Sequence, residues 1–109
     1  MFMKIAITSN GNELDSKLDG RFGRCSYFVL YDTQSKNIAF LPNPNKESIE
    51  GAGPASAQFI ASKGVQKVIS GEFGNKVKSI FESLQIQFVT LTETEKTIAE
   101  IIEMLNINK

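Results

Sequence analysis

Two amphipathic patterns in the second half of the chain constrain its fold most. In each of them apolar residues recur at i, i+3, i+4 and i+7, which places them on one face of an α-helix. The two sets are Val77, Ile80, Phe81 and Leu84, and then Ile98, Ile101, Ile102 and Leu105. A short run rich in apolar residues precedes each pattern, at 65–69 and at 86–91, and predicts a strand. Strands that alternate with helices are joined by right-handed crossovers, so this half predicts parallel pairing.

The first half of the chain predicts antiparallel pairing. A first strand is expected at residues 3–8. Two more strands, at 27–31 and 38–41, flank a polar turn at 32–37, which is the pattern of a β-hairpin. Pro42 ends the second strand of this hairpin.

Residues typical of helix ends mark the predicted start and end of the first helix and the predicted start of the last one. Pro54 after Gly53 is a good first helical residue, and Gly64 suits the C-terminal cap of that helix. The run Thr92–Glu95 has the spacing of a capping box before the last helix. All elements together predict an α/β fold, a single domain over residues 1–109 with a five-stranded mixed sheet flanked by about three helices. Ligands of such sheets bind beyond the carboxyl ends of the strands.

Composition excludes several classes of protein. The 109 residues suffice for one domain, and 12 basic against 12 acidic residues leave no net charge, which disfavours binding to nucleic acid. One cysteine and no histidine exclude an internal disulfide and a multi-cysteine zinc site. The longest aromatic and aliphatic run, Tyr27–Tyr31, is too short to cross a membrane, and no secretion signal is recognisable. We expect a cytoplasmic protein that binds neither nucleic acid nor membranes.

Three glycine-containing segments are the candidates for a binding site. They are Asp19–Arg24, Gly51–Pro54 and Gly71–Asn75, and the last two stand directly before predicted helices. Glycine lets the backbone approach a ligand closely, and a helix N-terminus carries free N–H donors and partial positive charge. Arg21 and Arg24 add forked donors that suit a carboxylate, a phosphate or a sulfide-rich anion. We expect the three segments to meet around an anionic ligand.

The candidate ligand-binding residues all come from these segments. They are Asp19, Arg21, Phe22, Gly23, Arg24, Gly51, Gly53, Gly71, Gly74 and Asn75. Structural roles are the alternatives: the arginines can pair with Asp19, Phe22 can anchor its loop in the core, and Asn75 can cap a helix. Cys25 is the candidate metal ligand if it is exposed, because neighbouring Arg24 would then lower its pKa. Its alternative is a small buried hydrophobe.

The sequence indicates no nucleophile or acid–base pair as clearly as the three glycine-containing segments indicate an anion site. We therefore expect a binding module and not an enzyme. The turn at 8–12 after the first strand is similar to a flavin-phosphate loop, but no long amphipathic helix follows it. A metal-dependent nuclease would need carboxylates on its central strands, whereas residues 4–8 and 65–70 contain none.

Four motifs follow one another along the chain. They are Asp19–Arg24 before an aromatic strand, Asn43-Pro44, Gly51-Ala52-Gly53 opening a helix, and Val68–Asn75. This ordered set resembles the dinitrogenase iron-molybdenum cofactor biosynthesis domain family, over nearly the whole chain. The resemblance implies a ribonuclease H-like α/β domain with a five-stranded mixed sheet. It also implies a protein that binds or carries the iron-molybdenum cofactor or its iron–sulfur precursors.

The chain departs from this family at two positions where histidine is frequent. Arg21 stands before the Phe-Gly-Arg core, and Ser48–Glu50 stands before the glycines of Gly51-Ala52-Gly53. An iron–sulfur cluster is usually held by several thiolates. With a single cysteine and no histidine, we expect backbone N–H groups and two arginines to hold a negatively charged cluster, or its organic acid, through the outer shell. We expect a non-catalytic carrier that transiently binds an iron-molybdenum or iron–sulfur cluster or its precursor. Cluster-assembly proteins are the expected partners. The alternative is a small-anion-binding or regulatory adaptor domain that has lost cluster binding.

Overall fold

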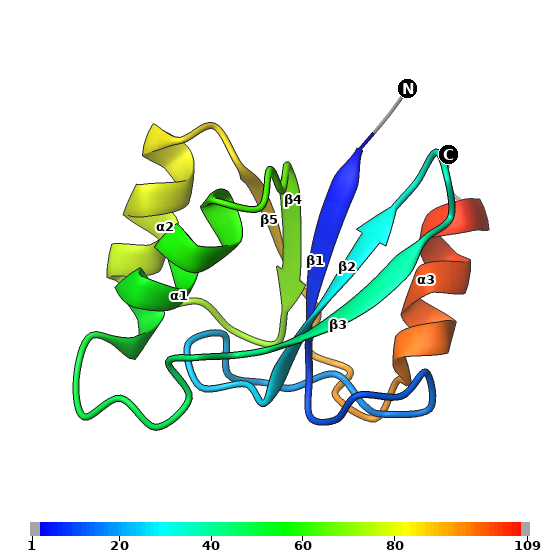
Figure 1. The fold of residues 1–109 in the computed structure, drawn as a ribbon, viewed down its shortest axis with the longest axis horizontal. Helices are drawn as coiled ribbons and strands as arrows, with labels where there is room; N and C mark the ends of the chain where they lie inside the picture. Colours follow the sequence, from blue (N-terminus) through cyan, green and yellow to red (C-terminus); the bar gives the residue numbers. More distant parts are fainter. Residues whose placement is uncertain (1–2, 108–109) are drawn as a thin grey trace.

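The computed structural model describes residues 3–107, with five strands and three helices (Figure 1). In order they are β1 (Lys4–Ser9), β2 (Tyr27–Asp32), β3 (Ile38–Pro42), α1 (Ala52–Ala61), β4 (Lys67–Ser70), α2 (Asn75–Ser83), β5 (Gln87–Thr90) and α3 (Ile98–Ile107). This is the order of elements predicted from the sequence. Within the described part of the chain, none of the helices has the length and apolar character needed to cross a membrane.

The five strands form one mixed sheet in the order β3-β2-β1-β4-β5. The β2–β3 hairpin is present, and β1 pairs antiparallel with β2. On its other side β1 pairs parallel with β4, which pairs parallel with β5. The predicted single α/β domain with a five-stranded mixed sheet and three helices is thereby confirmed. The narrower description as ribonuclease H-like stays a prediction.

Helices cover both faces of the sheet, so the domain has three layers (Figure 1). α1 and α2 pack on one face, and α3 packs on the other. Because successive side chains of a strand point to opposite faces, Ala6 of β1 belongs to the core under α1 and α2, whereas Ile5 and Ile7 belong to the core under α3. The predicted amphipathic helices bury most of their apolar stripes: Phe81 of α2 and Ile98 of α3 are fully buried. Leu84, the last residue of the first predicted stripe, instead lies just beyond α2 and is 45% exposed.

Aromatic rings fill the core between the sheet and the pair α1 and α2. Phe22 is only 3% exposed, and its ring centroid lies 5.5 Å from that of Phe28 and 5.6 Å from that of Phe73. Aromatic pairs at such separations each contribute about 0.5–1.5 kcal/mol beyond the burial of area. Phe22 therefore anchors the irregular connection between β1 and β2 to the core.

The ends of α1 differ from those predicted. The helix begins at Ala52, with Gly51 as its N-cap, and not at Pro54. Pro54 instead occupies the third helical position, where a backbone N–H would have no intrahelical acceptor. At the other end the capping residue is Ser62, and Gly64 follows it with a left-handed φ of 77°.

The capping box predicted at Thr92–Glu95 is wrong. Thr97 and Glu100 form the box of α3 instead: the Thr97 N–H donates to Oε1 of Glu100 at 2.8 Å, and the Glu100 N–H donates to Oγ1 of Thr97 at 3.1 Å. The Thr97 N–H, and the Thr97 hydroxyl that donates to the same Oε1 at 3.2 Å, hold the pKa of the Glu100 carboxyl below its ordinary value. Both segments have the required spacing, but only the second stands directly before the buried stripe that starts at Ile98.

Hydrogen bonds and one close backbone contact tie the β1–β2 connection to the carboxyl ends of β1 and β4. Oγ1 of Thr8 donates to the carbonyl oxygen of Asp19 at 2.8 Å, and the Gly71 N–H donates to the same oxygen at 3.4 Å. Gly20 and Gly71 then pack against each other, backbone on backbone. This contact fixes the arginine-containing segment beside the loop that leads into α2.

The contact between Gly20 and Gly71 provides a matched pair of substitutions. A Cβ on Gly71 would lie 2.5 Å from Cα of Gly20, whereas a Cβ on Gly20 would meet only the Cγ2 methyl of Thr94, at 3.6 Å. We expect Gly71→Ala to lower the free energy of unfolding by about 1–3 kcal/mol, as overpacking does. We expect Gly20→Ala to change it by less than about 0.5 kcal/mol. Urea unfolding followed by circular dichroism measures both, and equal stability of the two variants would contradict this packing.

Candidate functional site

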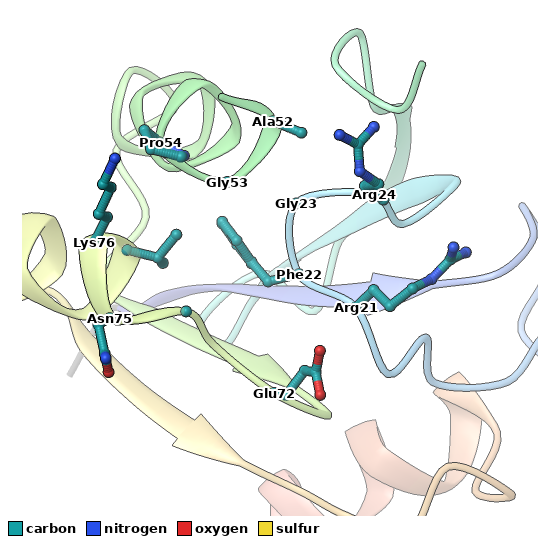
Figure 2. Close-up of a pocket in the computed structure, with 12 residues that line it drawn as sticks. Arg21, Phe22, Gly23, Arg24, Ala52, Gly53, Pro54, Glu72, Asn75 and Lys76 are labelled. Atoms are coloured by element: carbon teal, nitrogen blue, oxygen red, sulfur yellow. The ribbon is translucent and has the colours of Figure 1, made fainter. Parts of the chain in front are cut away.

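Residues from all three glycine-containing segments meet beyond the carboxyl ends of β1 and β4. They enclose a cleft of about 450 Å³ (Figure 2). Its lining residues are Arg21, Phe22, Gly23, Arg24, Ala52, Gly53, Pro54, Glu72, Gly74, Asn75, Lys76 and Val77. They belong to the β1–β2 connection, the first turn of α1, and the β4–α2 connection with the first turn of α2. We call residues 19–24 the arginine loop.

Glycines allow these segments to come so close. A Cβ on Gly23 would lie 2.7 Å from the backbone nitrogen of Gly53, and a Cβ on Gly53 would lie 2.9 Å from Cγ2 of Val77. The arginine loop therefore packs directly on the first turn of α1, which packs on the first turn of α2. Any larger residue at Gly23 would push the arginine loop away from α1 and open the cleft.

Both helices start without a side-chain cap. Their N-caps are Gly51 for α1 and Gly74 for α2, and neither helix has an acidic residue in its first turn. The first intrahelical bonds come from the N–H groups of Ala55 and Lys78. The earlier N–H groups have no intrahelical acceptor, and those at the cleft belong to Ala52, Gly53, Asn75, Lys76 and Val77. Two partial positive charges therefore meet at one cleft, which favours an anion.

Side-chain charge at the cleft is mainly positive. Arg21, Arg24 and Lys76 line it together with one acidic residue, Glu72. Arg24 and Lys76 flank the start of α1 from opposite sides, while Arg21 points away from that helix (Figure 2). The Arg21 Nε–H donates to Oδ1 of Asp19 at 3.4 Å, but most of the side chain is exposed. The excess of positive charge adds to the attraction that the helix N-termini exert on an anion.

Arg24 also holds the loop between β3 and α1. Its Nη1 donates to the carbonyl oxygens of Lys46 at 3.2 Å and Ser48 at 2.6 Å, and its Nη2 donates to that of Ile49 at 3.5 Å. Among the described residues no carboxylate pairs with this guanidinium. Its charge is therefore not neutralised by the protein.

Two buried polar side chains, Asn43 and Ser56, hold the backbone of the arginine loop. Neither is among the site residues predicted from the sequence. Nδ2 of Asn43 donates to the carbonyl oxygens of Gly23 and Cys25, both at 3.0 Å. Oγ of Ser56 in α1 donates to the same Gly23 oxygen at 3.1 Å. Asn43 and Ser56 are both buried, so these bonds fix the backbone on either side of Arg24.

Four of the predicted site residues do not line the cleft. Asp19 is buried, and its Oδ1 accepts the Arg21 N–H at 2.9 Å, so it shapes the arginine loop. Gly51 caps α1 with a left-handed φ of 73°, and Gly71 packs on the loop at Gly20. The fourth is Cys25.

Cys25 lies in the core under α1 and α2 and has no exposed surface. Burial, together with the nearby negative charge of Asp19, raises the pKa of its thiol to about 12. The thiolate is the form that binds metals, so this environment argues against the predicted role as a ligand. Nor does the described part of the chain place three or more His, Cys, Asp or Glu side chains together where they could hold a metal ion.

The prediction from sequence missed five lining residues. They are Ala52, Pro54, Glu72, Lys76 and Val77. All except Glu72 lie in the first turn of α1 or α2. Had the prediction counted a full first turn after each glycine, it would have included these four, because the N–H donors of a helix lie in that turn.

A second hollow, of about 520 Å³, lies before and along the start of α3. Its lining residues are Thr92, Glu93, Thr94, Glu95, Lys96 and Glu100. It is larger than the cleft at the arginine loop, but three glutamates against one lysine repel an anion. We therefore take the smaller, positively charged cleft as the candidate site.

Solved structures similar to this one support a shared fold. The apo form of the orange protein from Desulfovibrio gigas superposes with a TM-score of 0.89 at 25% identity, over 97% of this chain and 88% of that one. A NifB-like protein from Thermotoga, solved by NMR, superposes with a TM-score of 0.81 at 30% identity, over 96% of this chain and 88% of that one.

Sequence comparisons agree with this likeness. An uncharacterized protein of Methanocaldococcus jannaschii is 33% identical in an alignment of 87 positions that covers 77% of this chain and 70% of the relative. A profile of the family described as dinitrogenase iron-molybdenum cofactor matches residues 3–107, the whole described part of the chain. The chain belongs to the dinitrogenase iron-molybdenum cofactor family.

Proposed function

We propose that this domain is a non-catalytic carrier for an iron-molybdenum or iron–sulfur cluster, or a precursor of one. The observation that carries this proposal is the convergence of two uncapped helix N-termini with the Arg24 and Lys76 side chains on one cleft, which Arg21 also lines. Metal–sulfur clusters are commonly anionic, and hydrogen bonds to their sulfurs stabilise them. Membership in the family supplies the class of ligand, and the cleft supplies the donors that this class requires.

The donor set favours binding without bonds to the metal. Cys25 is buried, and the cleft is lined mainly by N–H groups, guanidinium groups and an ammonium group, with Glu72 as the one carboxylate. The N–H, guanidinium and ammonium donors contact the sulfide or oxide surface of a cluster and leave its metal ions to other ligands. A ligand held in this way leaves without breaking a metal–protein bond. Reversible binding is what a carrier that delivers to cluster-assembly proteins needs.

A simple anion-binding domain is the second candidate. The specific observation in its favour is that no donor at the cleft selects sulfur over oxygen. Guanidinium groups and helix N-termini also bind oxyanions such as phosphate and sulfate. In this alternative the cleft binds a small oxyanion, and the domain acts as a regulatory adaptor.

One titration separates the two candidates. Purified protein is mixed anaerobically with ferrous iron and sulfide, with or without molybdate, and in parallel with sulfate or phosphate alone. Absorbance that co-elutes with the protein in gel filtration, with a rise in melting temperature, supports the carrier. A rise in melting temperature with oxyanions alone supports the second candidate. No response to any of these probes contradicts both.

Neutralising a cationic side chain of the cleft should weaken binding of whichever probe, the iron–sulfide mixture or the oxyanion, raises the melting temperature in that titration. Lys76 lines the cleft, whereas Lys78 lies two residues further along α2 and does not line it. We expect Lys76→Gln to raise the dissociation constant about threefold to tenfold, because one favourable charge at the anion is lost. Lys78→Gln is the matched control and should stay close to the unmodified protein. Equal affinities of the two variants would show that the ligand binds elsewhere.

The buried thiol gives a further test of how a cluster is held. We expect Cys25 to resist a thiol reagent such as Ellman's reagent at pH 8 in the folded protein, because burial keeps the thiol inaccessible and its pKa at about 12. The same thiol should react fully in guanidinium chloride. A folded Cys25→Ala variant should keep the cluster absorbance. Loss of this absorbance in Cys25→Ala, with an unchanged circular dichroism spectrum, would instead identify Cys25 as a ligand.

A further inference from the structure

The loop between β3 and α1 is held to the domain by few contacts. Within residues 45–50 the turns are local: the Lys46 N–H donates to the Asn43 carbonyl oxygen at 3.3 Å, and the Ser48 N–H donates to that of Asn45 at 3.1 Å. Ile49, the one large apolar side chain of the loop, is 96% exposed, so it contributes nothing to packing. We call residues 45–50 the strap.

Arg24 makes the hydrogen bonds from outside that fix the tip of the strap. Its three bonds, to the carbonyl oxygens of Lys46, Ser48 and Ile49, are the only ones among the described residues that join the strap to a segment distant in sequence. In Figure 2 the Arg24 guanidinium lies between Ala52 at the start of α1 and the backbone of this loop. The position of the strap therefore depends on one side chain, which also lines the cleft.

The guanidinium can contact the strap and a ligand at the same time. It has five N–H donors in a planar fork. Both N–H bonds of Nη1 and one of Nη2 are directed to the strap. In the described residues the Nε–H and the second Nη2–H of Arg24 have no acceptor, and together they form the side edge that grips an anion with two parallel bonds. Because carbonyl oxygens carry no net charge, the positive charge of Arg24 stays available to that anion.

Asn43 connects the root of the strap to the backbone of Arg24. Its Nδ2 bonds to the carbonyl oxygens of Gly23 and Cys25, the two residues that flank Arg24. Its Oδ1 accepts the Asn45 N–H at 2.9 Å, where the strap begins. The root is thus fixed by buried bonds, and only the tip, at residues 46–49, depends on the guanidinium.

We propose that the strap positions Arg24 for the ligand and that a ligand in the cleft in turn stabilises the strap. This proposal rests on the proposed function in one respect, namely that the ligand is an anion in the cleft. A guanidinium held at three points loses less conformational entropy when it binds. Because coupling between two sites is reciprocal, the ligand must order the strap by the same factor by which the strap strengthens binding. A strap that reports occupancy is a signal that a cluster-receiving partner can read.

Amide hydrogen exchange tests the coupling. The Lys46 and Ser48 amides report on the strap, and the Lys36 amide, bonded to the Asp32 carbonyl oxygen at 2.8 Å in the β2–β3 turn, is the control. With sulfate or the iron–sulfide mixture at saturation, we expect exchange at Lys46 and Ser48 to slow by about fivefold or more, the lower end of typical couplings. Exchange at Lys36 should not change.

Two variants make the outcome decisive. Arg24→Lys keeps the charge but not the fork, and Arg24→Ala removes both. In both variants exchange at Lys46 and Ser48 should be faster than in the unmodified protein without ligand and should no longer respond to the probe. Binding of the probe, seen as a rise in melting temperature, without slower exchange at the strap would overturn the coupling while leaving the proposed function intact.

Absence of binding is a separate result. If no probe raises the melting temperature, the proposed function fails. The variants then still decide the structural half of the inference: equal exchange at the strap in Arg24→Ala and the unmodified protein would overturn the role of Arg24 in holding it.

Discussion

The site depends on close packing of backbone against backbone, which glycine alone permits. Gly20 contacts Gly71, and Gly23 contacts the first turn of α1 at Gly53. These contacts bring the arginine loop, α1 and α2 together at one end of the sheet. Without them the helices could still pack on the sheet through their apolar stripes, but their N-termini and the arginine loop would not share a cleft. The fold and the site therefore have different determinants: apolar periodicity sets the first, and glycine contacts set the second.

The same arrangement separates anchoring groups from binding groups. Phe22 is buried in the core, and Asn43 and Ser56 use their polar atoms to hold the arginine loop. This support leaves Lys76 and part of the Arg24 fork without a partner among the described residues, and it leaves the first N–H groups of two helices without caps. Such a site attracts negative charge and supplies many hydrogen-bond donors, but it offers no exposed thiolate. That combination suits cargo that is bound and handed on.

Periodicity predicted the fold well because the determining signals are local. The stripes that begin at Val77 and Ile98 become the core-facing sides of α2 and α3, with Leu84 as the exposed exception, and the β2–β3 hairpin forms around its polar turn. The capping box was placed wrongly because two neighbouring segments, 92–95 and 97–100, share its spacing, and only packing of Ile98 selects the second. Within the site, seven predicted residues line the cleft. The roles of Gly71 and Asn43 depend on partners far away in sequence, so no local pattern could indicate them. The exposure of Cys25 was open from the sequence for the same reason.

The central claim is that the N–H groups at the starts of α1 and α2 bind an anion together. An NMR titration that follows backbone amide shifts tests it most directly, because each N–H is observed separately. With sulfate, or with the iron–sulfide mixture if sulfate does not bind, the account predicts the largest shifts at Gly53, Lys76 and Val77, all with one common dissociation constant. Shifts concentrated at the acidic hollow of Thr92–Glu95, or different dissociation constants for the two helices, would contradict it.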